Sequence, residues 1–310
     1  MSASATAFAP ASVGNVGVGF DILGFSLDVL GDRVRASACE GEGVTISAVT
    51  GVAGDLPLVA ADNTAGRAVQ ALLEAARPAF GVELQIEKGI PLDSGLGGSA
   101  SSAVAAVVAA NALLSQPFSK VELLKFAMQG EAVASGSLHV DNVAPSLFGG
   151  LVLTVGIDAP YPKQIPVPSG IRAVVVHPRM FLATKQARAI LRPNVTMSDF
   201  VWQSANLAGF IAGCYANDLD LIRASFEDVV IEPQRQALIP GFQAARAAAM
   251  EEGALGCTIS GAGPTTFAWA TSDRADAVLR ATTQAFAAQK VETDGWIVEI
   301  GERGARLVDP

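Results

Sequence analysis

A loop of glycine and serine lies between a predicted strand and a predicted long helix, and this arrangement limits the folds and the ligands that the chain allows. Residues 82–88, VELQIEK, alternate apolar and polar side chains and predict a strand that ends before Pro91. The glycine-serine loop occupies 94–102, and a run of Ala and Val then continues without a helix breaker until Pro117, enough for about four helical turns. Glycines let the backbone approach an anion, and a helix N-terminus offers free N–H groups and positive potential. The segment therefore predicts a phosphate site.

This loop differs from the two best-known phosphate-binding sequences. No Lys-Ser or Lys-Thr pair follows its glycines, so it is not a Walker A loop, and its glycine spacing differs from G-x-G-x-x-G. A triphosphate held here would therefore depend on backbone N–H groups, hydroxyls and a metal ion, without a loop lysine. The alternative is a linker, or a tight turn that packs a helix of small residues against a sheet.

Charge and composition narrow the classes of partner. The net charge is −9 and the chain contains no basic cluster, so nucleic acid is not an expected partner. The three cysteines are far apart and form neither a disulfide framework nor a zinc spacing, which indicates a reducing, cytoplasmic setting. No apolar stretch is long enough to span a bilayer and no signal peptide pattern begins the chain, so no membrane association is expected.

Glycine also crowds the start of the chain. Residues 5–9 predict a short strand, and the glycine-rich loop that follows contains Asn15 and Asp21, whose short polar side chains can face a ligand. Ordinary Asx-turn chemistry is the alternative for each of them taken singly. Residues 33–39 and 43–49 predict two paired strands joined by a Glu-Gly-Glu-Gly turn.

Helix-capping patterns predict two further helices in the first half. Asp62 or Asn63 can cap a helix within 62–80. Ser119 and Glu122 form a capping box for a helix that reaches about residue 134 and carries Glu131 near its end. An exposed helix carboxylate is the simplest interpretation of Glu131 alone.

The segment 136–155 combines polar residues with a predicted strand at 150–155. His139, Asp141 and Asn142 fall within four positions of one another. A His beside an Asp is more often a satisfied structural pair than a catalytic one. Three such groups on a loop between a helix and a strand nevertheless favour a functional site.

Four prolines between residues 156 and 170 indicate a boundary between domains 1–156 and 157–310. The second half predicts the order strand, helix, strand, strand, helix, strand of a ferredoxin-like fold, with extra helices inserted. A glycine-rich turn at 260–264 joins two of the strands and, as a hairpin, needs no function. Strands are predicted at 171–177, 257–260, 265–271 and 295–300, and helices at about 184–191, 198–216, 218–226, 242–252 and 273–288.

Three separated segments resemble the GHMP kinases. They are FAPASVGNVGVGFDILG at 8–24, GLGGSASSA at 95–103 and LGCTISGAGPTTFA at 255–268. Within this family, the segments GFDILG, HVDNVAPSLFGG, TKQARAIL and EPQRQALIPGF are most similar to the homoserine kinases. The chain departs from the usual family loop GLGSSA at Gly98, which removes one hydroxyl donor and keeps the backbone N–H.

The resemblance implies a fold and an activity. The fold class would be α+β: a GHMP kinase two-domain fold, with an N-terminal ATP-binding domain like domain 2 of ribosomal protein S5 and a C-terminal ferredoxin-like domain. The activity would be ATP- and Mg²⁺-dependent phosphorylation of the L-homoserine side-chain hydroxyl, a step of threonine biosynthesis. Another small-molecule kinase of the family, such as a mevalonate-type enzyme, is the alternative. A relative that binds a nucleotide or metabolite without catalysis is a second one, and a homodimer is left open.

The resemblance also implies roles for individual residues. Mg²⁺ would be held by Ser99 and Glu131, and Asp141 and Asn142 would be catalytic. ATP would be bound by the loop and its neighbours: Asn63, Pro91, Ser94, Gly95, Leu96, Gly97, Gly98, Ser99, Ala100, Ser101 and Ser102. The amino-acid substrate would be bound by Asn15, Asp21, His139, Arg188, Arg235 and Gly261, with the arginines on its carboxylate and Asp21 on its ammonium.

The role of Asp141 stays open between two possibilities. In mevalonate kinase the matching aspartate is interpreted as a general base, whereas in homoserine kinases it can instead only shape the site. A general base contributes about 3–5 kcal/mol, and alignment of two bound reactants about 7–11 kcal/mol. Because phosphoryl transfer through a loose transition state depends mainly on alignment and electrostatics, turnover without this carboxylate is expected.

Overall fold

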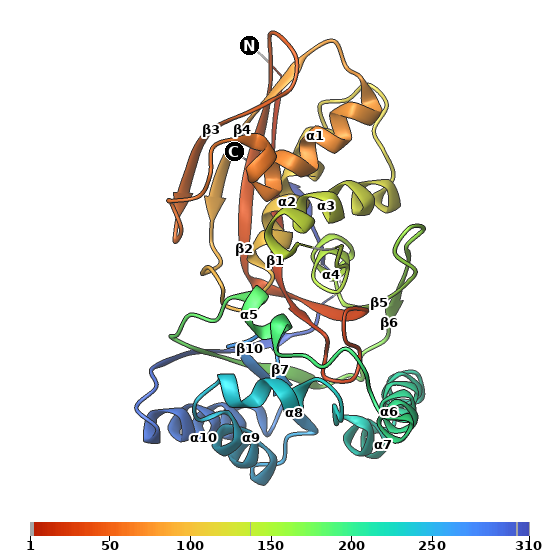
Figure 1. Ribbon diagram of the computed structural model, residues 1–310, viewed down its shortest axis with the longest axis vertical. Coiled ribbons are helices and arrows are strands. Elements are labelled where there is room, and N and C mark those ends of the chain that lie inside the picture. The colour runs from red at the N-terminus through yellow and green to blue at the C-terminus, as the bar shows by residue number, and fades with distance from the viewer. Residues whose placement is uncertain (1–2, 137, 302, 310) are drawn as a thin grey trace.

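Two sheets, each covered by helices, make up the computed structural model, which describes residues 3–136, 138–301 and 303–309 (Figure 1). The first sheet has the order β11-β1-β2-β4-β3, with β5 paired to β2 and β6 to β5. The alternation of VELQIEK gives β4 a buried face of three apolar side chains, Val82, Leu84 and Ile86, followed by Lys88, which is also buried. The strands of this sheet are β1 (Ser4–Gly14), β2 (Leu23–Cys39), β3 (Val44–Gly51), β4 (Gly81–Lys88), β5 (Leu151–Val155), β6 (Tyr161–Ile165) and β11 (Arg306–Val308).

The predicted pairing of residues 33–39 with 43–49 is wrong. Both segments are strands, but β4 lies between β2 and β3, antiparallel to the first and parallel to the second. β4 buries residues along its length, whereas Ile46 is the one buried position of β3 among the residues described, so β4 takes the central place and β3 the edge. The Glu-Gly-Glu-Gly turn therefore does not close a hairpin. It carries the chain across the position of β4, so that β2 and β3 are not neighbours in the sheet.

Helices α1 (Thr64–Ala76), α2 (Gly98–Asn111), α3 (Lys120–Ser135) and α4 (Val143–Phe148) pack with the first sheet, after a short 3₁₀ helix, Ala60–Asp62. α2 contacts β1 and β2 and is buried along most of its length, which its sequence of Ala and Val permits. Two predicted caps are confirmed. Asn63 accepts hydrogen bonds from the first-turn N–H groups of α1, and Ser119 forms the capping box with Glu122.

The second sheet confirms the predicted ferredoxin-like order. Its strands are antiparallel in the order β10-β7-β9-β8. Within the described part of the chain, no helix has the length and apolarity that crossing a bilayer requires. The strands are β7 (Ile171–Pro178), β8 (Gly256–Ile259), β9 (Thr266–Thr271) and β10 (Thr293–Glu299), and the helices are α5 (Thr184–Ala189), α6 (Met197–Ala216), α7 (Leu219–Ser225), α8 (Glu232–Arg235) with a 3₁₀ turn Gln236–Leu238, α9 (Phe242–Glu251) and α10 (Ala275–Ala288).

A shared apolar core joins the two halves. Phe25 of β2 packs edge-on against Phe267 and Trp269 of β9, with ring centroids 5.3 and 6.1 Å apart. The division into domains at residue 156 stays a prediction, and the first sheet includes β6 and β11 from beyond that point. Because aromatic packing fixes one half against the other, loops from both can line one cavity.

Candidate functional site

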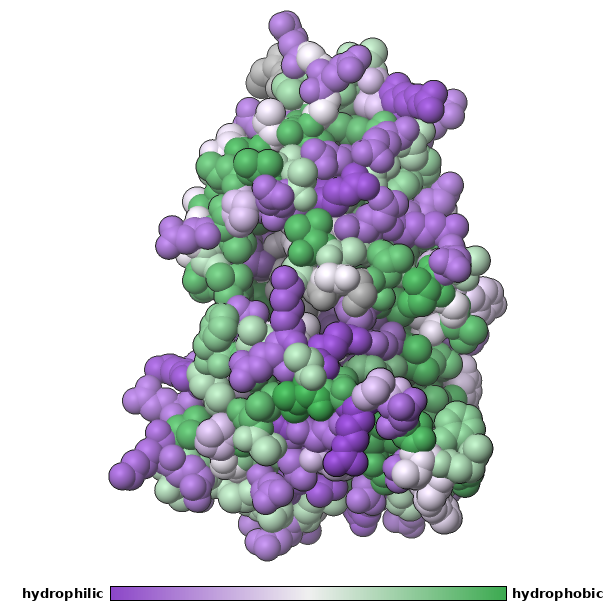
Figure 2. Space-filling model, in the orientation of Figure 1, coloured by the Kyte–Doolittle hydropathy of each residue, from purple (hydrophilic) through white to green (hydrophobic). Residues whose placement is uncertain are grey.

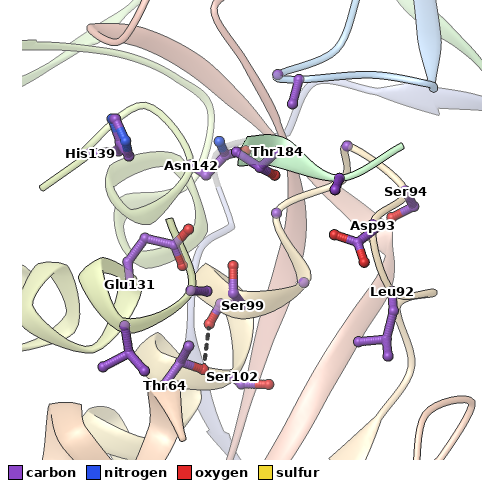
Figure 3. Close-up of a pocket in the computed structure, with 18 of the residues that line it drawn as sticks. Thr64, Leu92, Asp93, Ser94, Ser99, Ser102, Glu131, His139, Asn142 and Thr184 are labelled. Carbon is purple, nitrogen blue, oxygen red and sulfur yellow. Dashed lines mark hydrogen bonds between the residues drawn. The ribbon is translucent and has the colours of Figure 1, made fainter. Parts of the chain in front are cut away.

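A cavity of about 450 Å³ lies at the N-terminus of α2 and takes residues from both halves of the chain (Figure 3). Of the residues predicted for the site, most line it: Asn15, Asp21, Asn63, Pro91, Ser94, Gly95, Gly97, Gly98, Ser99, Ser102, Glu131, His139, Asp141, Asn142, Arg188, Arg235 and Gly261. Residues as distant in sequence as Asn15 and Gly261 therefore meet here, and they are joined by a hydrogen bond of 2.8 Å.

The glycine-serine loop is clamped in a conformation that only glycine adopts readily. Gly95 and Gly97 have φ angles of +76° and +66°. Ser260 donates to the carbonyl oxygen of Gly95 at 2.6 Å, and the N–H of Thr265 donates to that of Ser94 at 3.2 Å. The first N–H groups of α2, which lack acceptors within the helix, are consequently presented at the cavity.

Three predicted loop residues have side chains that do not line the cavity. Leu96 and Ala100 are fully buried in the apolar cores. Ser101 donates to the carbonyl oxygen of Ala9 at 2.7 Å and accepts from the N–H of Asp32 at 3.1 Å, so its hydroxyl holds β1 and β2 to α2. At these three positions only the backbone remains for a ligand.

Lys88 lies beneath the glycine-serine loop and was not predicted as part of the site. Its ammonium pairs with the Asp32 carboxylate and donates to Gly98 O at 2.7 Å and Ser102 Oγ at 2.8 Å. The side chains of Lys88 and Asp32 are 1% and 0% exposed. The alternation of VELQIEK places Lys88 on the same strand face as Val82, Leu84 and Ile86, which is a sequence signal for its burial. Its partner Asp32 is 56 positions away, and no local pattern identifies that pairing.

Ser99 and Glu131 meet on one side of the cavity, directed toward each other in Figure 3. Burial raises the pKa of Glu131 to about 7, although the hydrogen bond from Ser99 lowers it. The negative charge of Asp141 adds to the rise. Among the residues described, no group of three or more His, Cys, Asp or Glu side chains could hold a metal ion. The donor set here is thus one carboxylate and one hydroxyl.

Asp141 and Asn142 lie at the start of α4, against the end of β1. A Cβ atom at Gly14 would lie 2.3 Å from Oδ2 of Asp141 and 2.6 Å from Nδ2 of Asn142, so glycine is required for this close approach. Ser12 donates to Oδ1 of Asn142 at 3.0 Å, which fixes the orientation of the amide. Burial, together with the charge of Asp21, raises the pKa of Asp141 to about 7.

Asp21 and Arg188 form a bidentate ion pair at the other end of the cavity. Nη1 and Nη2 of Arg188 donate to the two carboxylate oxygens at 3.2 and 2.8 Å. Nη2 also contacts Nδ1 of His139 at 3.3 Å. Burial lowers the pKa of His139, so this ring is neutral near pH 7. In the part of the chain that the structure describes, the buried Nε of Arg188 has no hydrogen-bond partner.

Arg235 is buried next to this pair and is held by backbone carbonyls. Its Nε donates to Ala187 O at 3.1 Å and its Nη1 to Gly261 O at 2.9 Å. The ring of Phe20 lies 5.3 Å from the guanidinium of Arg188 and 5.3 Å from that of Arg235. Phe20 therefore contributes cation–π attraction to both guanidinium groups.

Further residues complete the lining of the cavity. Asn63 uses both ends of its amide within the protein, since Oδ1 caps α1 and Nδ2 donates to Pro57 O at 2.9 Å. Sequence reasoning missed Leu56, Pro57, Thr184 and Lys185, which also line the cavity. Of the other lining residues, Asp62 and Thr64 flank the predicted Asn63, and Leu92 and Asp93 lie between the predicted Pro91 and Ser94.

Two domain models match the chain: the GHMP kinases N terminal domain at residues 63–150 and the GHMP kinases C terminal domain at residues 210–288. A homoserine kinase of Xanthomonas campestris pv. campestris (strain B100) is 49% identical, and one of Xylella fastidiosa (strain M12) is 47% identical. Each match covers 98% of this chain and 94% of the relative.

Solved structures agree with these matches. The crystal structure of a homoserine kinase from Cytophaga hutchinsonii has a TM-score of 0.94 at 42% identity and covers 98% of this chain and 97% of that one. A mevalonate kinase from L. major, solved with R-mevalonate, has a TM-score of 0.68 at 17% identity over 96% of each chain, so it shares the fold alone.

Proposed function

The chain belongs to the homoserine kinases of the GHMP kinase family, and from this membership we propose how its cavity works. The enzyme transfers the γ-phosphoryl group of ATP to the side-chain hydroxyl of L-homoserine, giving O-phospho-L-homoserine and ADP, a step of threonine biosynthesis. The predicted two-domain GHMP kinase fold is confirmed. The relatives that match nearly the whole chain at 40–49% identity are homoserine kinases, which argues against the mevalonate-type and non-catalytic alternatives.

ATP binds with its triphosphate on the glycine-serine loop. Three features support this assignment: the left-handed Gly95 and Gly97, the first N–H groups of α2, whose N-cap Gly97 makes no side-chain capping hydrogen bond, and the clamp on the loop from Ser260. Backbone N–H groups supply the donors, and Lys88 stays beneath the loop because its ammonium hydrogens are engaged by Asp32, Gly98 and Ser102. Asn63 and its neighbours line the nucleotide end of the cavity.

Glu131 and Ser99 fit a magnesium site. Mg²⁺ prefers few protein oxygens and completes its coordination with water and phosphate oxygens, which suits one carboxylate beside one hydroxyl. The raised pKa of Glu131 reflects a buried carboxylate whose charged form a cation would stabilise. When bound, Mg²⁺ neutralises charge on the β- and γ-phosphates.

The Asp21–Arg188 pair is the site for the two charges of homoserine. Homoserine is a zwitterion. Its ammonium can pair with Asp21 and its carboxylate with Arg188 in place of the Asp21–Arg188 pair, so no buried charge is left uncompensated. Nε of Arg188 can donate to the homoserine carboxylate. Arg235 also lies in this part of the site, with its guanidinium against the ring of Phe20. Asp21 then receives the ammonium. Asn15, His139 and Gly261 complete the wall.

Asn142 and Asp141 align the hydroxyl that is phosphorylated. The amide of Asn142 is fixed by Ser12, so it can hold the substrate oxygen in line with the γ-phosphorus. The new P–O bond forms as the bond to the β-phosphate oxygen breaks, and the hydroxyl proton leaves to phosphate or solvent. Asp141 lies beside this amide, with its Oδ2 3.5 Å from Nδ2 of Asn142, and because phosphoryl transfer depends mainly on alignment and electrostatics it serves mainly to shape the site.

The ion pair of Asp21 with Arg188, in the same cavity as the glycine-serine loop, is the observation that supports this function most directly. A coupled ADP-release assay with Mg·ATP tests it against homoserine, mevalonate, galactose and shikimate. Homoserine should be phosphorylated far faster than the others. Mevalonate has a carboxylate and no ammonium, so it gives Asp21 no partner. Equal rates with mevalonate and homoserine, or no rate with homoserine, would overturn the assignment.

We also infer a cytoplasmic setting and an assembly of two copies. All three cysteines are free thiols, and two of them are buried, which suits a reducing compartment.

A further inference from the structure

Helix α8 brings Arg235 to the cavity, and its buried side is charged instead of apolar. All four of its residues are described by the structure, and the two that are buried are Glu232 and Arg235. Figure 2 shows a mainly hydrophilic surface where Figure 1 places this helix. A single helical turn is unstable by itself, and helices in proteins are normally held by an apolar face that packs on a core. Polar contacts must therefore hold α8 in place.

A buried carboxylate just before α8 accepts hydrogen bonds from its first backbone N–H groups. Oδ1 of Asp228 accepts from the N–H groups of Val230 and Ile231, both at 2.8 Å. Oδ2 accepts from the N–H of Glu232 at 2.9 Å. Burial raises the pKa of Asp228, while these three donors and the charge of Arg235 lower it. At an ordinary helix start one acceptor oxygen is enough, and Asn or Ser caps as well as Asp, whereas here both oxygens of a carboxylate are used.

A second buried carboxyl group fastens α8 to the elements beside it. Oε2 of Glu232 accepts a hydrogen bond from Oγ1 of Thr258 on β8, and Oε1 lies 3.4 Å from Nε of Arg246 on α9. Glu232 and Arg235 are three positions apart, so they lie on the same face of the helix. A shift of Glu232 would therefore move Arg235 with it.

The guanidinium of Arg235 reaches the cavity from this fixed helix. Two of its nitrogens donate to the carbonyl oxygens of Ala187 and Gly261. Among the residues described, the third nitrogen, Nη2, has no hydrogen-bond partner, so it can donate to a ligand carboxylate. The planar guanidinium binds a carboxylate in a fixed geometry, and a group displaced by about 1 Å can lose about 10²-fold in rate.

We propose that Asp228 and Glu232 are positioning residues, which hold α8, and through it the guanidinium of Arg235, where the homoserine carboxylate binds, an assignment that rests on the proposed function. Both groups are absent from the described lining of the cavity, so their effect on the substrate should pass through Arg235. A role in stability alone is the alternative, and it predicts no preference for one substrate over the other.

Steady-state kinetics with Mg·ATP and homoserine test the proposal with Asp228→Asn. The amide keeps one acceptor oxygen but turns an NH₂ group toward the N–H of Glu232, so α8 should shift. KM for homoserine should rise about 10- to 100-fold, and KM for ATP should change by less than about twofold.

Asp218→Asn is the matched control for the loss of a helix cap. Asp218 caps α7 with one oxygen, which accepts from the N–H of Leu221 at 3.0 Å. α7 contributes no residue to the described lining of the cavity. Because Asn caps an ordinary helix start as well as Asp, both KM values should remain those of the wild type.

The Arg235→Ala background separates positioning from general stability. Asp228→Asn added to Arg235→Ala should change KM for homoserine by less than about twofold, because the group through which Asp228 acts is already gone. Thr258→Val is the second variant if Asp228→Asn does not fold. It removes the hydroxyl that donates to Glu232, and it should raise KM for homoserine about 10-fold while KM for ATP stays unchanged.

Amide hydrogen exchange of residues 230–232, measured without substrate, gives a readout that is independent of activity. Exchange should be faster in Asp228→Asn than in the wild type and unchanged in Asp218→Asn. The proposal is wrong if exchange in Asp228→Asn is not faster, if both KM values rise equally, or if the effects of Asp228→Asn and Arg235→Ala on KM for homoserine multiply. A wild type that does not phosphorylate homoserine would contradict the proposed function itself, whereas unchanged kinetics of the variants in an active enzyme would contradict only the positioning role.

Discussion

Removing the lysine beneath the glycine-serine loop tests how that loop is held. The side chains of Lys88 and Asp32 are 1% and 0% exposed, so Lys88→Met leaves a carboxylate in the interior without its counter-charge. Breaking a buried pair in this way costs about 3–5 kcal/mol. Asp32 keeps three donors, the N–H groups of Gly89 and Ile90 and the hydroxyl of Ser102, at 2.9, 3.3 and 2.6 Å. The loss should therefore fall near the lower limit, about 3 kcal/mol.

Urea unfolding followed by circular dichroism measures this change. Lys185→Met is the matched control, because Lys185 lines the same cavity but is exposed, and it should change the free energy of unfolding by less than about 0.5 kcal/mol. Adding Asp32→Asn to Lys88→Met removes the stranded charge and should restore about 1 kcal/mol or more.

The same variant separates a structural lysine from a phosphate ligand. Lys88 holds the Gly98 carbonyl at the start of α2, so Lys88→Met should also raise KM for ATP through a displaced loop. If the free energy of unfolding stayed within about 1 kcal/mol of the wild type while ATP affinity collapsed, the lysine would be binding phosphate directly, and the reasoning given for this pair would be refuted.

Three further predictions concern single carboxyl or guanidinium groups. Asp141→Asn should keep measurable turnover, and complete loss of activity with unchanged binding of ATP and homoserine would contradict the alignment role. Arg235→Ala should raise KM for homoserine far more than KM for ATP, and equal effects in steady-state kinetics would remove Arg235 from the substrate site. Burial raises the pKa of Glu232 from 4.5 to about 7, so this group favours folding in its neutral form and its contribution is lost as pH rises from 4.5 through 7. The free energy of unfolding in urea, measured at about pH 5 and about pH 8, should therefore rise for Glu232→Gln relative to the wild type between the two values, by at most about 3 kcal/mol. A difference between variant and wild type that does not change with pH would contradict this.

Local features of the chain were largely predictable from its sequence. The alternation of β4, the capping box at Ser119 and Glu122, and the order of elements in the second half all depend on neighbours a few positions apart. The glycine-serine loop could be identified because the residues that would bind phosphate are adjacent in the sequence.

Long-range partnerships could not be predicted in the same way. The pairing of β2 with β4 depends on which strand buries more apolar surface, a comparison across the whole sheet. Lys88 is paired with Asp32, and Phe20 contacts two arginines that lie far along the chain. The pairing of Asp21 with Arg188 joins residues 167 positions apart, although each was predicted separately as part of the substrate site.

A crystal structure with a non-hydrolysable ATP analogue and homoserine tests the central claim most directly. The β- and γ-phosphates should accept hydrogen bonds from backbone N–H groups of residues 95–100, with the homoserine carboxylate on Arg188 and its ammonium on Asp21. A triphosphate bound away from residues 94–102, or held by the Lys88 ammonium, would contradict the account.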